Sequence, residues 1–223
     1  MNIHHRLNKL FTKDFHAKDL TKKVAVKTFS CPLITICKVN LKKESCFTPY
    51  LGNVGTKIML VAEAPSVKRK NVGAHVAGLF ENTENKSLNS IRNFVEKYFN
   101  TTPYFTDLMK CGVRKQTREE KKKIFGIRTE KCMKHYLLKE IKILQPEIIL
   151  CLGYLAYTKL KEAKKNGKID NHIKLRKLLH YGTQASWSLN AEDKLNYIWP
   201  LQLGKIPDAK LSNLSYFKKL KNE

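Results

Sequence analysis

Two carboxylates and one histidine occupy positions at which a folded chain would bring them together: Glu63, Asp107 and His180. Each follows or ends a short run of the kind that forms a buried strand. A carboxylate can orient or activate a water molecule or bind a divalent metal ion, and a histidine can donate a proton. These residue types indicate a chemical site, provided that the strands deliver them to one edge of a sheet.

The segments between these residues predict the elements that would position them. Apolar runs alternate with segments of helical spacing, which is typical of a parallel α/β sheet with helices on both faces. The predicted strands are KIMLVAEAP (57–65), PYFTDLMKC (103–111), EIILCLG (147–153) and KLRKLLHYG (174–182). The predicted helices are 87–99, 130–144 and 155–163, and the charged segment 112–128 is expected to be a solvated loop or helix. We therefore expect a three-layer α/β/α sandwich with a central four-stranded parallel sheet, in which ligands bind beyond the carboxyl ends of the strands.

The charge of the chain indicates a polyanionic partner. Its 223 residues include 43 Lys and Arg against 19 Asp and Glu, a net charge of +24. Nucleic acid is the first expectation and an anionic membrane the second, although lysine-rich codon usage in an AT-rich genome would account for part of the excess. Residues 1–30 are predicted to form a basic N-terminal arm and residues 31–223 a single domain. No apolar run approaches the length of a membrane span, and residues 1–13 contain no signal-peptide core, so we expect an intracellular, cytoplasmic protein.

The chain contains six cysteines, which in a reducing compartment are expected to be thiols or metal ligands rather than disulfides. Cys151 lies in the middle of a predicted strand and is expected to belong to the core. The other five are Cys31, Cys37, Cys46, Cys111 and Cys132.

An ordered set of segments resembles the uracil-DNA glycosylase superfamily, and most closely its iron–sulfur (family 4 type) enzymes. AEAPS (62–66) stands where that family has GEAPG or GEGPG, and Phe80 in GLFENTENKSLNSI (78–91) matches its base-stacking phenylalanine. YFTDLMKC (104–111) resembles its ITNVVKC, and HYG (180–182) stands where it has a histidine followed by proline. EKCMKHYLLKEIKILQPEIILCLG (130–153) resembles its cysteine–helix–strand block, and the whole likeness runs from about residue 31 to about residue 190.

The resemblance implies a nucleoid-associated enzyme that acts on DNA as a monomer, without a membrane or an obligate protein partner. It would flip a base out of the duplex and hydrolyse its N-glycosidic bond. Phe80 would stack on the base, Glu63 would orient or activate the water, and His180 would donate to the leaving base. Backbone groups of Ala62, Ala64 and Ser66 would complete the pocket. We expect hydrolysis without lyase chemistry, because no lysine stands out at a strand end as a Schiff-base residue.

The resemblance also implies a [4Fe–4S] cluster, with tetrahedral zinc as the second choice. Cys111 and Cys132 match the family's later pair of ligands, although the loop between them is longer here. Cys37 matches one early ligand by its distance from AEAPS. Cys31 is preferred as its partner, and Cys46 is the alternative to Cys31. Unligated buried cysteines remain the competing interpretation, because the early spacing contains no C-x-x-C.

Asp107 departs from the family in the residue that binds the edge of the base. The family's asparagine donates to O4 of uracil and accepts from N3–H, whereas an ionised carboxylate can only accept. Such a carboxylate would repel O4 but accept from the amino group of a cytosine. Ser66 leaves room for a substituent at C5, so we hold uracil and a modified cytosine, such as those of phage DNA, as equal alternatives. Excision of a modified cytosine would suit a role in antiphage defence, and excision of uracil would suit a role in base excision repair.

Two other classes of function remain open at this point. A non-catalytic nucleic-acid-binding protein with a structural metal site would carry the same charge but release no base. A nuclease with Glu63 and Asp107 as metal ligands would require a divalent ion.

Overall fold

A parallel sheet of four strands forms the centre of the computed structural model, which describes residues 3–15, 31–33, 35–37, 44–47, 55–64, 75–76, 86–113, 118–179 and 199–203. The strands lie in the order β4-β2-β6-β7, and every neighbouring pair is parallel. Their bounds are β2 Ile58–Ala62, β4 Tyr104–Asp107, β6 Ile148–Leu152 and β7 Lys174–Leu178. All five residues of β2 are buried, because a parallel sheet with both faces covered excludes water from both sides. The predicted α/β architecture is confirmed.

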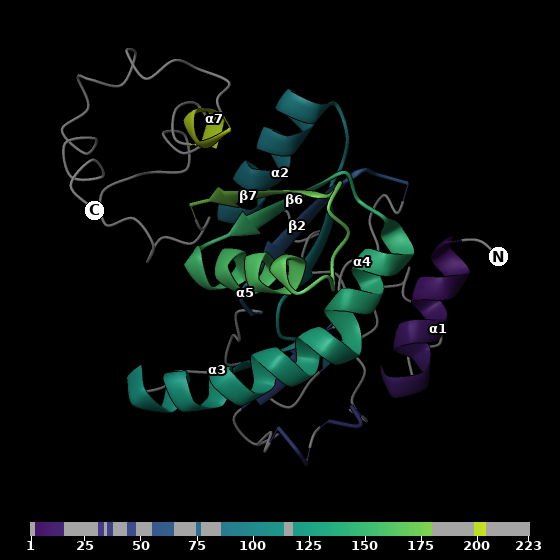
Figure 1. Ribbon diagram of the computed structural model, residues 1–223, viewed down its shortest axis with the longest axis vertical. Coiled ribbons are helices and arrows are strands. Elements are labelled where there is room, and N and C mark those ends of the chain that lie inside the picture. The colour runs from purple at the N-terminus through teal and green to yellow at the C-terminus, as the bar shows by residue number, and fades with distance from the viewer. Residues whose placement is uncertain are drawn as a thin grey trace.

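Helices cover both faces of this sheet, which completes the three layers (Figure 1). The helices on one face are α1 Ile3–Phe15, α4 Leu138–Leu144 and α5 Tyr154–Lys165, and those on the other are α2 Lys86–Phe99 and α7 Trp199–Gln202. Alternate residues of β2 belong to the two hydrophobic cores on opposite faces of the sheet, because successive side chains of a strand point to opposite faces. Met59 and Val61 pack with the first set of helices, whereas Leu60 packs with α2.

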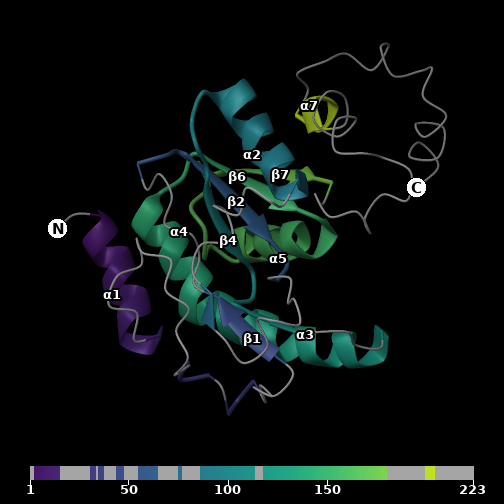
Figure 2. The same ribbon diagram turned by 180° about the vertical axis from the view of Figure 1, so that it is seen from behind.

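The N-terminal helix α1 packs against the core through one side. Leu7 and Phe11 are fully buried, and the ring of Phe11 stacks on that of Tyr136 with centroids 5.8 Å apart. The helix lies beside α4 in both views (Figure 1 and Figure 2). Part of the predicted basic arm is thus a packed helix, and the domain boundary at residue 30 stays a prediction.

The segment 103–111 is not one strand, which corrects the sequence prediction. β4 ends at Asp107, the chain bends through 108–110, and Cys111 begins β5 Cys111–Val113. β5 belongs to a second, small sheet with β1 Glu44–Phe47 and β3 His75–Val76, which the sequence did not predict. At this bend the side chain of Lys110 turns inward and contacts the last residues of β4 and Glu140.

One long helical segment follows the small sheet. α3 Arg118–Cys132 begins inside the charged segment for which loop and helix were both expected. A π-helical turn, Met133–Leu137, joins it directly to α4. A π turn inserts one extra residue and rotates the faces of the helix on either side of it. It lets both Cys132, before the turn, and Glu140, after it, be buried.

Candidate functional site

The exits of β2 and β4 are joined into one structural unit. Ala62, the last residue of β2, lies opposite Asp107, the last residue of β4, in the parallel register. Beyond the strands, Leu108 N donates to the carbonyl oxygen of Ala62 at 2.8 Å, and Met109 N donates to that of Glu63 at 3.1 Å. Backbone hydrogen bonds between the two segments therefore continue beyond the ends of β2 and β4. They place Glu63 and Asp107 at neighbouring strand ends, as the sequence predicted.

Asp107 is a buried carboxyl group at this edge. Its side chain is 8% exposed, and among the described residues no donor makes a hydrogen bond to its carboxyl oxygens. Burial raises the pKa of Asp107 from 3.8 to about 7; the ammonium of Lys110 lowers it and the carboxylate of Glu140 raises it further. Near neutral pH the group is therefore divided between an acid that can donate and a carboxylate that can only accept.

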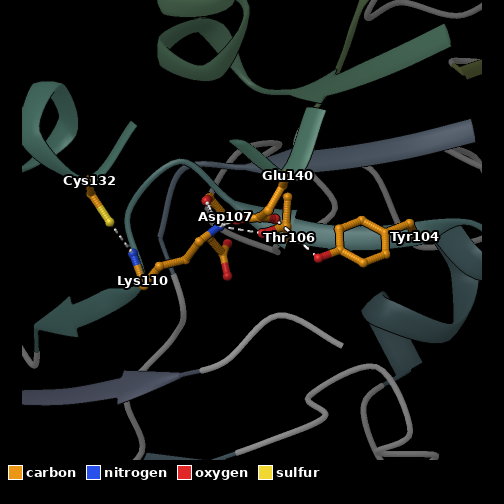
Figure 3. A network of polar contacts seen from close by, with 6 residues as sticks. All are labelled: Tyr104, Thr106, Asp107, Lys110, Cys132 and Glu140. Atoms are coloured by element: carbon orange, nitrogen blue, oxygen red, sulfur yellow. Dashed lines mark hydrogen bonds and ion pairs between the residues drawn. The ribbon is translucent and has the colours of Figure 1, made fainter. Parts of the chain in front are cut away.

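A buried ion pair lies next to Asp107 (Figure 3). Lys110 Nζ lies 2.6 Å from Glu140 Oε1, and their side chains are 3% and 0% exposed. The same ammonium donates to Thr106 Oγ1 at 2.5 Å and to the carbonyl oxygen of Asp107 at 2.8 Å. Tyr104 Oη donates to Glu140 Oε2 at 3.2 Å, whereas Glu140 Oε1 makes only the ion contact, without the alignment of a hydrogen bond. Figure 3 shows the carboxyl group of Asp107 pointing away from Glu140.

Sequence reasoning missed this pair, although a signal was present. The apolar positions of the predicted helix 130–144 include Tyr136, Ile141 and Leu144, and Glu140 is four residues after Tyr136. Positions four apart lie on the same face of a helix. A glutamate on the buried face predicts a buried cationic partner.

The other predicted site residues vary in how far the structure places them. Ala62 is fully buried, and Glu63 and Ala64 are half-buried. Ser66, Phe80 and His180 lie outside the described residues. Leu179, the residue before His180, is held by α7: its carbonyl oxygen accepts from Trp199 Nε1 at 2.9 Å, and its nitrogen donates to Gln202 Oε1 at 2.8 Å. β7 ends at the same edge as β2 but two strand spacings away, about 10 Å.

Four of the five predicted ligand candidates gather near the loop that follows Asp107. Cys37, Cys111 and Cys132 are buried and Cys31 is partly buried. Burial first, and then the nearby thiols of Cys111 and Cys31, raise the pKa of Cys37 to about 11. Burial also raises the pKa of Cys132 well above its usual value, with Cys111 and Cys31 contributing in the same direction. Cys37 and Cys132 therefore each lie close enough to Cys31 and Cys111 for their thiolates to repel.

Positive groups and N–H donors surround these thiols. Lys110 N donates to Cys132 Sγ at 3.2 Å, and Arg128 Nε donates to the carbonyl oxygen of Cys37 at 2.9 Å. Arg128 and Lys131 lower the pKa of Cys37, and Lys110 lowers that of Cys132. These groups offset part of the effect of burial, which still leaves the pKa of both thiols raised. The backbone of Cys46 lies opposite Cys111 in the small sheet, and its side chain is outside what the structure describes.

The donor set suits an iron–sulfur cluster in number and type. Within the described ranges, however, no group of three or more His, Cys, Asp or Glu side chains could hold one metal ion. A [4Fe–4S] cluster binds its four thiolates through four different irons, so its ligands surround a volume, whereas tetrahedral zinc needs all four on one ion. The cofactor therefore stays a prediction. Cys151 is fully buried in the core, as predicted, and burial raises its pKa to about 12.

A comparison with protein families matches residues 49–216 to the uracil DNA glycosylase superfamily. The chain belongs to this superfamily. The matched range contains the exits of β2 and β4, the Lys110–Glu140 pair and the whole central sheet. No curated protein sequence matches the chain.

Membership in the uracil DNA glycosylase superfamily indicates DNA glycosylase activity, because members of the superfamily are hydrolases that act on DNA. The superfamily includes iron–sulfur members. Among the described helices, none is both long and apolar enough to cross a lipid bilayer.

Proposed function

We propose that this chain is a monofunctional DNA glycosylase that flips a pyrimidine out of DNA and hydrolyses its N-glycosidic bond. The observation that carries the proposal is the joined exit of β2 and β4, where Glu63 and Asp107 lie at neighbouring strand ends within the matched family range. In parallel α/β sheets this edge is where ligands bind. The net charge of +24 supports binding to the phosphate backbone.

Each residue has a defined part in this reaction. Phe80 stacks on the flipped base, and Asp107 binds the edge that carries O4 or the amino group. Glu63 orients the attacking water and offsets the positive charge that develops on the sugar as the bond breaks. His180 donates to the leaving base, and backbone groups between Ala62 and Ser66 complete the pocket.

The excised base is either uracil or a modified cytosine, and the buried Asp107 allows both. A protonated Asp107 presents one donor and one acceptor, which match O4 and N3–H of uracil as an asparagine amide does. An ionised Asp107 accepts from the amino group of a cytosine. Release of a modified cytosine would support a role in antiphage defence, and release of uracil a role in base excision repair.

We further propose that Cys31, Cys37, Cys111 and Cys132 hold a [4Fe–4S] cluster, with Cys46 as the alternative to Cys31. The cluster would tie the N-terminal segment to the loop after β4 and to the end of α3, and would take no part in hydrolysis. This role is supported by the thiols that gather from three separate segments of the chain and by the positive groups around them.

The experiment is base release from oligonucleotides that carry uracil, 5-hydroxymethylcytosine or its glucosylated form at one position. The protein is incubated with each in EDTA, and abasic sites are detected by alkaline cleavage. We expect release from at least one oligonucleotide in EDTA and none with Glu63→Ala, which should still bind DNA. Strand cleavage that requires a divalent ion would indicate a nuclease, and binding without any release would indicate a non-catalytic protein.

A further inference from the structure

The proposed mechanism does not account for the buried pair of Lys110 and Glu140. Stability is a weak reason for such a pair, because removing two charges from water costs about as much as their attraction returns, and apolar residues of similar size often serve as well. The pair is nevertheless almost completely buried, at 3% and 0% exposure. Its polar partners point to a more specific role.

The hydrogen bonds of the pair converge on β4. The Lys110 ammonium binds the hydroxyl of Thr106 and the carbonyl oxygen of Asp107, and the Glu140 carboxylate accepts from the hydroxyl of Tyr104. The pair thus contacts three of the four residues of the strand that ends in Asp107. Fixing the carbonyl group of Asp107 fixes the peptide plane next to the Cα that carries its carboxyl group. The ammonium also places a positive charge on the side of Asp107 that faces the protein interior.

We propose that Lys110 and Glu140 are positioning residues for base recognition: held beneath β4, they fix the backbone of Asp107 and balance the charge at its carboxyl group, and so determine which pyrimidine edge it binds. This inference rests on the proposed function and names the determinant of its substrate class. Neither residue touches the base.

The electrostatic consequence has a definite sign for each partner. The charged groups that act on Asp107 among the described residues are Lys110 in the bend after β4 and Glu140 on α4. Lys110 lowers the pKa of Asp107 and favours the carboxylate, which binds an amino group. Glu140 raises that pKa and favours the acid, which binds uracil.

Two single substitutions therefore predict opposite results. Lys110→Met leaves two carboxyl groups without a cation, so Asp107 should hold its proton to higher pH. Glu140→Gln keeps the size of the side chain and an acceptor for Tyr104, but removes the carboxylate that raises the pKa of Asp107, so Asp107 should lose its proton at lower pH. We expect the midpoints to move in opposite directions by about one pH unit.

The measurement is release of uracil and of 5-hydroxymethylcytosine from one mixture of two labelled oligonucleotides between pH 5.5 and 9. The ratio of the two rates cancels a general loss of folding or of catalytic power. Asp107→Asn identifies the part of the pH profile that belongs to Asp107. If the protein releases only one of the bases, the pH midpoint of that release serves instead. The matched control is Lys57→Met with Glu147→Gln, an ion pair at 4.0 Å whose side chains are 61% and 67% exposed.

The double variant Lys110→Met/Glu140→Leu covers the case in which a single variant does not fold, because it removes both charges of the ion pair together. We expect it to fold, to keep its KM and to release the base with a kcat about tenfold lower. The proposal is supported if the pH midpoints of the two single variants move in opposite directions. It is also supported if the double variant has a lower kcat at unchanged KM. Shifts in the same direction, or rates and pH profiles equal to those of the control, overturn it. Failure of the unsubstituted protein to release any base would instead refute the proposed function, and the inference with it.

Discussion

Lys110 donates a hydrogen bond from its ammonium to the carbonyl oxygen of Asp107 over 2.8 Å, at the point where β4 leaves the sheet. A lysine three residues after an aspartate thus folds back under it instead of extending into solvent. The contact joins the edge proposed to bind the base to the loop that leads to Cys111. Four properties of this edge and its surroundings can be tested directly.

Asp107→Asn should change the preferred base. The amide donates and accepts at every pH, so release of uracil at pH 8 should rise about tenfold relative to the unsubstituted chain, and release of an amino-bearing base should fall. Rates from single-turnover reactions on both oligonucleotides check this. Normal uracil release that Asp107→Asn leaves unchanged would show that Asp107 does not select the base.

The stability of the protein should fall as pH rises through neutrality. The folded-state pKa of Asp107 is about 7 against 3.8 for the unfolded group. Its contribution to stability is therefore fully present below pH 3.8 and is lost as pH rises through 7. Between pH 5.5 and 8 the free energy of unfolding should drop by about 2 kcal/mol more in the unsubstituted chain than in Asp107→Asn. Urea unfolding at both pH values measures this, and equal drops would contradict it.

Glu63→Gln should lower the rate of base release about 10²- to 10⁴-fold, because the amide cannot accept a proton from water. The Kd for undamaged DNA should stay within about twofold, as measured by fluorescence anisotropy. Glu162→Gln is a matched control, since Glu162 lies on α5, pairs with Lys159 and has a side chain that is 57% exposed. If Glu63→Gln releases the base at the same rate as the control, Glu63 takes no part in the reaction.

The purified protein should be brown, with absorbance near 400 nm. Cys132→Ser and Cys111→Ser should lose the colour and bind less iron per chain. Cys151→Ala should keep both, because Cys151 is fully buried in the core. A colourless protein that contains one zinc per chain would indicate that the cysteines bind zinc instead of a cluster. A protein with neither metal would make the four thiols ordinary buried cysteines.

The local patterns of the sequence determined the fold and the edge of the sheet that carries the candidate site. Continuous apolar runs such as 148–152 predicted buried parallel strands, and the exits of two of these runs placed Glu63 and Asp107 at one edge of the sheet. Cys151 was assigned to the core for the same reason. These features depend on periodicity over a few residues, which is visible without any knowledge of long-range contacts.

Only the tertiary structure decided how Asp107 is buried and what lies beneath it. Lys110 and Glu140 are 30 residues apart, and nothing local indicates that the bend after β4 and the π turn before α4 would bring their charges to 2.6 Å. The split of 103–111 between two sheets likewise depends on a second sheet whose strands come from distant parts of the chain. A buried charge is stable only with a counter-charge supplied from elsewhere in the chain, so its position is a property of the assembled core.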